Sequence, residues 1–423
     1  MNAEALRALE VECAQRHAEF CKAGLALDLT RGKPAADQLD LASHLDGALQ
    51  GDYRSEDGTD TRNYGGLRGI VEARRLGAAL LGAPLAQVMA GGNSSLTLMY
   101  LFVETAHLFG LGDQGPWRDD AAGAPKVLCP VPGYDRHFAI CEQLGIEMVN
   151  VPMLATGPDM DAVEAAVRDD PSIRAIWCVP KYSNPTGCVY DEATVARFAG
   201  LPKLAAPGFR ILWDNAYAVH DLEPDPPHLA ELFSLAKQAG TEDGVVMFGS
   251  TSKVTFAGAG VAFMAASTPV LGAFEQRLGA LMIGPDKVNQ LRHAKLFPDM
   301  EALTSHMRRH AAIIQPKFEA VQEALEAGLA GTGFATWTRP RGGYFVSVDT
   351  LPGLAREVIR LAADAGVKLT PAGATFPYGR DPEDRNIRLA PTFPPLADVR
   401  RAMEVFINCV RLASARASLQ ENS

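Results

Sequence analysis

Short apolar runs alternate with stretches of helical periodicity along the middle of the chain. The apolar runs predict β-strands at residues 88–90, 127–129, 146–151, 173–179, 209–213, 245–248 and 261–264. Helical patterns lie between several of them, at residues 95–109, 161–168 and 191–199. Alternating strands and helices indicate βαβ units. We therefore expect an α/β fold with a mixed, mostly parallel sheet that helices cover on both faces.

Both ends of the chain differ from this middle part. Residues 3–23 predict a surface helix, and a loop rich in Gly, Pro and Asp follows it. Beyond residue 296 the pattern predicts a long helix at 300–329, a strand at 345–348, and helices near 353–365 and 395–415. We therefore expect three parts: an N-terminal segment at 1–50, a large domain at 51–295, and a smaller α+β domain at 296–423 that the N-terminal segment joins.

Composition narrows the class of protein. The 423 residues are 47 % hydrophobic and 21 % charged, as in an ordinary globular protein, and the net charge is −10. An acidic chain has little attraction for phosphate backbones or anionic lipid, so we expect neither a nucleic-acid partner nor a membrane. The seven cysteines are scattered without a CxxC pair, which predicts no disulfide framework and no metal site. The polar N-terminus does not resemble a signal peptide, and we expect a cytoplasmic protein.

Polar turns follow five of the predicted strands. In chain order these turns are Gly91-Gly92-Asn93-Ser94-Ser95, Pro132-Gly133-Tyr134, Tyr182-Ser183-Asn184-Pro185-Thr186-Gly187, Asp214-Asn215-Ala216-Tyr217 and Gly249-Ser250-Thr251-Ser252-Lys253. In open α/β sheets, ligands bind beyond the carboxyl ends of the strands. We therefore expect the five turns to meet in one cleft.

Together these turns hold the groups that a pyridoxal phosphate (PLP) site needs. Lys253 supplies an amine for a Schiff base, and Asp214 ends a buried strand, where a carboxylate can keep the pyridine nitrogen protonated. The phosphate needs hydroxyl and N–H donors at a helix N-terminus, and the sequence predicts these at Asn93, Ser94, Ser95, Ser250 and Ser252. The remaining cofactor contacts expected are Tyr217 and Asn184 on the ring hydroxyl, and Tyr134 on the ring face.

Each motif alone has a plainer interpretation. Asn-Pro-Thr-Gly is typical of a turn and Ser-Thr-Ser-Lys of a loop. Asp214 alone is compatible with a helix cap, and Tyr134 alone with a packed surface aromatic. The occurrence of all of them in order, each after a strand, favours the cofactor site.

The same motifs resemble the class I/II aminotransferases, PLP enzymes of fold type I, almost from end to end. The segment Asp28–Pro34 is similar to the part of that family that closes over substrate, and Tyr64-Gly65-Gly66-Leu67-Arg68-Gly69 is similar to its Tyr-Gly-x-x-x-Gly signature. The resemblance implies that Gly32, Asn184 and Arg388 bind the substrate, with Arg388 as a bidentate clamp on the α-carboxylate. It also implies a homodimer in which Tyr64 reaches the cofactor phosphate in the other subunit.

One position departs from the family pattern. The family usually carries an arginine eight residues after the lysine, and this chain has Val261 there. The stretch Ser250–Val261 resembles a divergent subgroup, the MocR-like or type Ic aspartate aminotransferases, which favours aspartate as the amino donor. An acidic donor needs a second cation, and the candidates are Arg31, Lys33, Arg292, His293 and Arg341.

The resemblance therefore implies ping-pong transamination between an L-amino acid and a 2-oxo acid, with 2-oxoglutarate as the expected acceptor. The same scaffold also supports PLP-dependent β-lyases and related chemistry, because the protein only selects which bond to Cα is broken. A second alternative is a non-catalytic PLP-binding regulatory domain. The complete catalytic set argues against that alternative. In regulators that resemble this chain, the PLP-binding domain follows a DNA-binding winged helix, and here the resemblance begins by residue 28, so we expect no such helix ahead of it.

Overall fold

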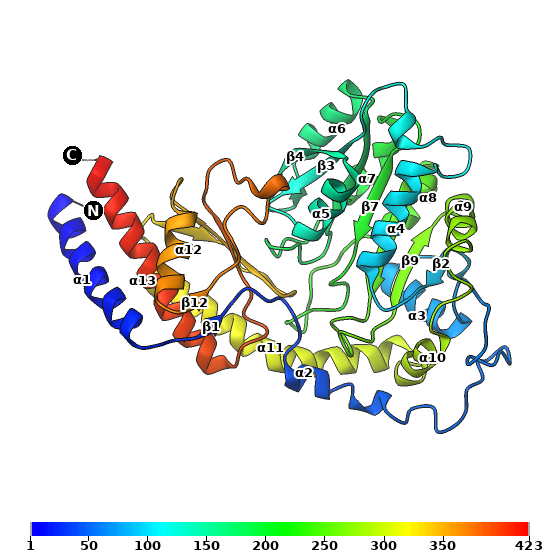
Figure 1. The fold of residues 1–423 in the computed structure, drawn as a ribbon, viewed down its shortest axis with the longest axis horizontal. Helices are drawn as coiled ribbons and strands as arrows, with labels where there is room; N and C mark the ends of the chain where they lie inside the picture. Colours follow the sequence, from blue (N-terminus) through cyan, green and yellow to red (C-terminus); the bar gives the residue numbers. More distant parts are fainter. Residues whose placement is uncertain (1, 422–423) are drawn as a thin grey trace.

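An eight-stranded sheet forms the centre of the larger part of the molecule (Figure 1) in the computed structural model, which describes residues 2–421. Its strand order is β2-β9-β8-β7-β6-β3-β4-β5. The strands are β2 (Val88–Ala90), β3 (Lys126–Val131), β4 (Glu147–Leu154), β5 (Gly157–Pro158), β6 (Ile173–Cys178), β7 (Arg210–Asp214), β8 (Val245–Ser250) and β9 (Ala262–Ala266). The five strands from β8 to β4 are parallel, while β9 and β5 run antiparallel to their neighbours.

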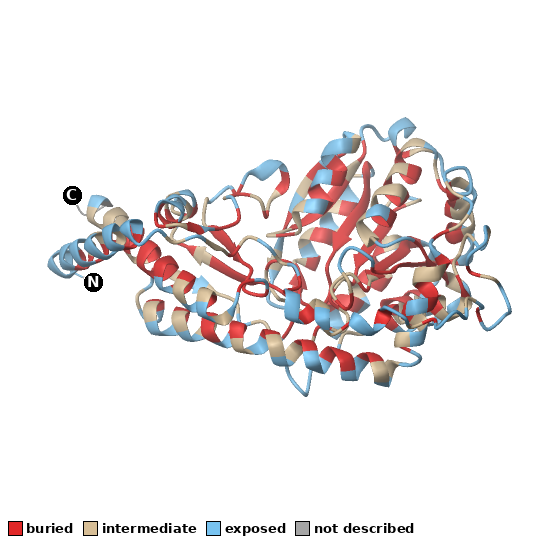
Figure 2. Cartoon of the chain, turned by 60° about the horizontal axis from the view of Figure 1, so that its bottom comes forward, coloured by how far each residue is buried: buried red, intermediate tan, exposed pale blue. Residues whose placement is uncertain are grey.

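Helices cover both faces of this sheet, which explains the nearly continuous apolar runs of its strands. Along β7, Ile211 and Trp213 belong to the core on one face, and Leu212 belongs to the core on the other. In Figure 2 the central strands are almost uniformly buried, whereas the surrounding helices expose one side. These helices are α3 (Val71–Leu81), α4 (Ser95–Leu108), α5 (Asp135–Leu144), α6 (Met160–Asp169), α7 (Glu192–Gly200), α8 (Leu232–Ala239), α9 (Thr268–Leu278) and α10 (Lys287–Leu296).

The smaller part combines both ends of the chain. An antiparallel sheet has the order β10-β11-β13, and a separate short pair joins β1 in parallel with β12. The N-terminal helix α1 packs against the C-terminal helix α13, and the two termini lie near each other at the far end of the molecule (Figure 1). The elements are α1 (Ala3–Lys22), β1 (Leu27–Asp28), α2 (Ala36–Asp40), α11 (Met300–Leu329), β10 (Ala335–Trp337), β11 (Val346–Thr350), α12 (Ala355–Asp364), β12 (Val367–Lys368), β13 (Asn386–Leu389) and α13 (Leu396–Glu421).

The predicted α/β fold class, with a mixed, mostly parallel sheet and a smaller α+β part, is confirmed. The long helix at 300–329 is found at those bounds, whereas the last helix continues from 396 to 421. Helix α10 was not anticipated because three polar side chains, Lys287, Gln290 and His293, lie on its buried face and hide the apolar periodicity. Among residues 2–421, no helix combines the length and the apolar character needed to cross a bilayer.

Candidate active site

The five polar turns meet at the carboxyl ends of the parallel strands, as the topology requires. They line a cavity of about 370 Å³. The residues predicted for the cofactor that line this cavity are Asn93, Ser94, Ser95, Tyr134, Asn184, Asp214, Tyr217, Ser250, Ser252 and Lys253. Of the cofactor residues expected from the sequence, only Tyr64 lies outside this group.

Lys253 follows β8 and stands among aromatic rings. Its Nζ lies 5.0 Å from the ring centroid of Tyr217 and 5.9 Å from that of Tyr344. Loss of water around the ammonium group lowers the pKa of Lys253, and the nearby Asp214 carboxylate only partly opposes this shift. A lowered pKa increases the fraction of neutral amine, which is the nucleophilic and proton-accepting form.

Asp214 is the last residue of β7 and has one oxygen paired and one oxygen free. Its Oδ2 lies 3.0 Å from Nε2 of His137, whose imidazole stacks on Trp177 at 4.1 Å between ring centroids. Both Asp214 and His137 are 2 % exposed. The other carboxylate oxygen, Oδ1, is buried and has no partner among the described residues. A buried acceptor normally needs a donor, so this oxygen fits the protonated pyridine nitrogen of a cofactor.

His137 was not among the residues predicted from the sequence. It lies in the first turn of α5, three residues after Tyr134, and packs edge-to-face against the Tyr134 ring. The sequence offered one signal that Asp214 has such a partner: a buried carboxylate at the end of a strand requires a group that pairs with it. Which histidine supplies the partner depends on how α5 packs on the sheet.

A donor-rich pocket for an anion forms where two turns are tied together at the N-terminus of α4. The Asn93 amide donates to the carbonyl of Gly258 at 3.0 Å, and the Ser252 hydroxyl donates to the carbonyl of Asn93 at 3.1 Å. The Ser250 and Ser252 hydroxyls lie 3.1 Å apart, and the Ser94 side chain forms no capping bond to its own helix. The Ser94 hydroxyl and the first N–H groups of α4 suit a phosphate, with the Ser250 and Ser252 hydroxyls beside them.

Val261 does not contribute a cation to this pocket. Its side chain is 1 % exposed and packs in the core, and its N–H donates to the Thr251 hydroxyl at 2.8 Å. Within residues 2–421, Lys253 is the only basic residue that lines the cavity. Among the residues that line this cavity, the groups suited to a phosphate are therefore neutral donors and the positive end of the α4 dipole.

Of the three residues expected to bind substrate, Arg388 contacts Asn184, and both Arg388 and Gly32 lie against Phe345. Arg388, on β13, places Nη1 3.2 Å from the side-chain oxygens of both Asp135 and Asn184. The Arg388 guanidinium carbon lies 4.8 Å from the centroid of the Phe345 ring. Gly32 approaches the same ring so closely that an added Cβ would lie 2.1 Å from Cζ. Phe345 thus supports the arginine and limits the space beside Gly32, a role the sequence did not reveal.

Tyr64 lies away from the cavity of its own chain. Its side chain is 84 % exposed, although the loop that carries it is firmly held. Nζ of Lys287, a buried residue, donates to the carbonyls of Asn63 at 2.8 Å and Gly65 at 2.6 Å. Leu281 and Ile283 are also exposed, at 50 % and 64 %. The loop that Lys287 holds therefore presents the Tyr64 side chain to solvent.

Two of the five candidates for a side-chain cation are already engaged elsewhere. His293 is fully buried, with Nε2 2.8 Å from the Thr255 hydroxyl. Arg341 forms an ion pair with Glu223. The Arg31 side chain pairs weakly with Asp28 at 3.5 Å, and Nζ of Lys33 lies 4.0 Å from the ring centroid of Phe393.

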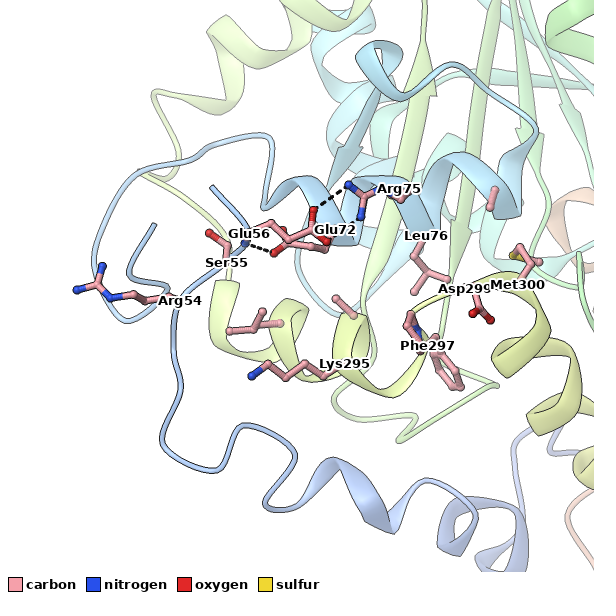
Figure 3. Close-up of a pocket in the computed structure, with 14 residues that line it drawn as sticks. Arg54, Ser55, Glu56, Glu72, Arg75, Leu76, Lys295, Phe297, Asp299 and Met300 are labelled. Carbon is pink, nitrogen blue, oxygen red and sulfur yellow. Dashed lines mark hydrogen bonds and ion pairs between the residues drawn. The ribbon is translucent and has the colours of Figure 1, made fainter. Parts of the chain in front are cut away.

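A larger cavity, of about 560 Å³, lies between α3, α10 and the start of α11 (Figure 3). Its lining combines the apolar Leu76 and Phe297 with charged side chains, some of which form hydrogen bonds or ion pairs within the cavity. Arg75 pairs with Glu56 at 3.0 Å, and Glu72 accepts a hydrogen bond from the backbone of Glu56. None of the turns that follow the parallel strands reaches this cavity, so the candidate chemistry stays with Lys253.

The layout around Lys253 defines the class of PLP fold type I enzymes, in which a parallel sheet presents its strand ends to the cofactor. A sequence model described as "Aspartate amino-transferase" matches residues 1–422. The chain belongs to the aspartate aminotransferase family and is an aminotransferase.

Three comparisons illustrate this relationship. An aspartate aminotransferase of Corynebacterium glutamicum is 45 % identical over 416 residues, which cover 98 % of this chain and 95 % of that protein. A crystal structure of an aspartate transaminase from the same species has a TM-score of 0.95 at 45 % identity, over 99 % of this chain and 98 % of that one. An α-aminoadipate aminotransferase from Thermus thermophilus, complexed with N-(5'-phosphopyridoxyl)-L-leucine, shares the fold at 24 % identity, with a TM-score of 0.73 and 94 % of each chain covered.

Proposed function

We propose that this aminotransferase uses PLP attached to Lys253 and transfers the amino group of aspartate to 2-oxoglutarate. The observation that carries the cofactor assignment is the unpaired Oδ1 of Asp214, buried beside a lysine of lowered pKa. Support for aspartate comes from the Corynebacterium glutamicum relative, an aspartate aminotransferase that matches nearly the whole chain.

When bound, the cofactor supplies an electron sink for the bond that breaks at Cα of the amino acid. Asp214, oriented by its bond to His137, holds a proton on the pyridine nitrogen. Nζ of Lys253 accepts the proton from Cα of the amino donor, and its lowered pKa keeps a larger fraction of the amine unprotonated for this role. Tyr134 would cover the ring face, and Tyr217 and Asn184 would contact the ring hydroxyl.

Arg388 binds the α-carboxylate of the substrate, because a guanidinium group offers two parallel N–H donors to a carboxylate. Its Nε is buried and has no partner among the described residues, and it is free to donate to an incoming carboxylate. Gly32 allows the N-terminal segment to lie against Phe345 and close the substrate side of the site. Asn93, Ser94, Ser95, Ser250 and Ser252 hold the phosphate.

The proposal includes a cytoplasmic homodimer in which Tyr64 completes the phosphate site of the partner. Support comes from the exposure of Tyr64 on a loop held by Lys287, beside exposed Leu281 and Ile283. We also propose the division into parts 1–50, 51–295 and 296–423. The packing of α1 on α13 and the pairing of β1 with β12 support the joining of the first part to the last. The MocR-like subgroup stays a prediction.

Initial rates with several amino donors test this function. With aspartate and 2-oxoglutarate varied together, a ping-pong enzyme gives parallel double-reciprocal lines, and alanine, an aromatic amino acid and cystathionine serve as competing donors. Lys253→Ala should abolish turnover, whereas the control Lys126→Ala, at a partly exposed ion pair with Asp170, should retain it. Faster turnover of another donor would overturn the aspartate assignment, and turnover by Lys253→Ala would overturn the site.

A further inference from the structure

Buried side chains from distant elements bind the backbone that directly follows Lys253. The Lys253 carbonyl accepts from Nε2 of His220 at 3.3 Å and from the Tyr344 hydroxyl at 3.5 Å. The Val254 carbonyl accepts from Nε2 of His306 at 2.7 Å. The nearby backbone N–H groups of Val254 and Thr255 donate to the carbonyl of Thr251 and not to these two carbonyls. These two carbonyls therefore depend on side chains to hold them.

A second layer of buried groups holds the first. Nε2 of His310 lies 3.0 Å from Nε2 of His306, so the two rings meet beside the Val254 carbonyl. The Gln38 amide nitrogen lies 3.1 Å from Nδ1 of His310 and 3.1 Å from the Tyr344 hydroxyl, which links both branches. The amide oxygen of Gln38 accepts from the backbone N–H of Ala35 at 3.1 Å. All members are nearly inaccessible to water; they are Gln38, His220, His306, His310 and Tyr344.

The direction of the hydrogen bonds is fixed by Gln38. An amide nitrogen can only donate, so Nδ1 of His310 must accept and its proton must be on Nε2, the atom that lies next to the His306 ring. Burial lowers the pKa of His310 to about 4, with His306 and Arg309 adding to the effect, so the ring is neutral near pH 7. Because Nε2 of His306 donates to the Val254 carbonyl, it cannot also accept from His310. The His310 ring therefore holds the His306 ring by packing against it, at 4.8 Å between ring centroids.

We propose that Gln38 and His310 are positioning residues of the aminotransferase reaction, which fix the main chain from which Lys253 swings between its cofactor-bound and its proton-accepting positions. This inference rests on the proposed role of Lys253. Gln38 lies in α2, in the same N-terminal segment as Gly32, and His310 lies in α11. The position of the lysine therefore depends on the segment that closes against Phe345.

The test compares variants that keep or remove the acceptor for the Gln38 amide. His310→Gln keeps a side-chain acceptor for that amide, whereas His310→Phe fills the same space without one. We expect His310→Phe to lower kcat for aspartate by about tenfold or more, because small displacements of a reacting group slow chemistry steeply. KM should stay within about twofold, since no substrate contact is lost.

Two further measurements separate positioning from a merely structural role. The primary kinetic isotope effect with α-deuterated aspartate should increase in His310→Phe, because the proton transfer to Lys253 becomes more limiting. The cofactor-free variant should also acquire the visible band more slowly when mixed with PLP. His310→Gln should lie closer to the wild type on both measures. Gln38→Leu, in a different helix, should reproduce the effects of His310→Phe if that variant does not fold.

The matched control is His17→Gln, which alters a partly buried imidazole that binds the Leu361 carbonyl at 2.8 Å, far from the lysine. It should leave kcat and the isotope effect unchanged. A wild type without turnover would overturn the proposed function itself. A functional wild type, with His310→Phe and Gln38→Leu that keep its kcat and isotope effect, would overturn only the positioning role. Equal losses in His310→Gln and His310→Phe would also overturn it.

Discussion

Replacement of Gly32 by alanine tests how closely the N-terminal segment must approach Phe345. The new Cβ would lie 2.1 Å from Cζ and 2.5 Å from Cε1 of that ring. Carbon atoms pack comfortably at about 3.5 Å or more, so either the ring or the segment must retreat by more than about 1 Å. The ring cannot retreat alone, because the Arg388 guanidinium lies 4.8 Å from its centroid. Overpacking of this kind destabilises by about 1–3 kcal/mol when the surroundings resist.

The displacement falls on the residue that binds the α-carboxylate. Since a shift of about 1 Å can reduce a rate by about a hundredfold, we expect kcat/KM for aspartate to fall by one to two orders of magnitude. Steady-state rates measure this, with the PLP content of each protein checked by absorbance. Gly272→Ala is the matched control, because its Cβ would meet nothing within 4 Å. A Gly32→Ala enzyme with kcat/KM within twofold of the wild type would refute the proposed closure against Phe345.

Three other changes have defined outcomes. His137→Phe keeps a ring on Trp177 but removes the hydrogen bond to Asp214. Loss of a hydrogen bond to a charged group costs about 1.5–3 kcal/mol, so kcat should fall tenfold or more. An unchanged kcat would contradict the role of His137. Tyr64→Phe should raise the dissociation constant for PLP. The free energy of unfolding should change by less than about 0.5 kcal/mol, because the Tyr64 side chain is exposed. An unchanged affinity for PLP would argue against a contact of Tyr64 with a partner's phosphate. Burial lowers the pKa of His220 to about 3 and that of His310 to about 4. Below about pH 6.5 the unfolded chain therefore binds more protons than the folded chain. The free energy of unfolding should decrease as the pH falls from 6.5 toward 4. Urea titrations should show a smaller decrease for His310→Gln, and an equal decrease would contradict the buried neutral state of His310.

The parts of the site that the sequence revealed are those set by topology. Lys253 and Asp214 follow buried strands, and parallel strands bring their carboxyl ends together whatever the details of packing. His137, Phe345, Gln38 and His310 were missed because each acts through a contact between distant elements that no local pattern encodes.

The failure to predict helix α10 has a related physical cause. In α10, Lys287 and Gln290 are buried because they bind backbone carbonyls of the loops beside them, so a polar sequence covers a buried face. Periodicity detects only faces that are buried by apolar contact. Tyr64 illustrates the opposite limit, because its exposed side chain is proposed to act on a second chain, and the fold of one chain does not test that proposal.

The central claim is that Lys253, Asp214 and Arg388 together exchange the amino group of aspartate. The most direct measurement follows the visible spectrum of the PLP-loaded protein, first with aspartate alone and then with 2-oxoglutarate. We expect aspartate to remove the band of the lysine-bound cofactor and to produce the pyridoxamine form, and 2-oxoglutarate to restore the original band. Lys253→Ala should show neither change. A band that persists with aspartate, or a change that 2-oxoglutarate does not reverse, would contradict the account.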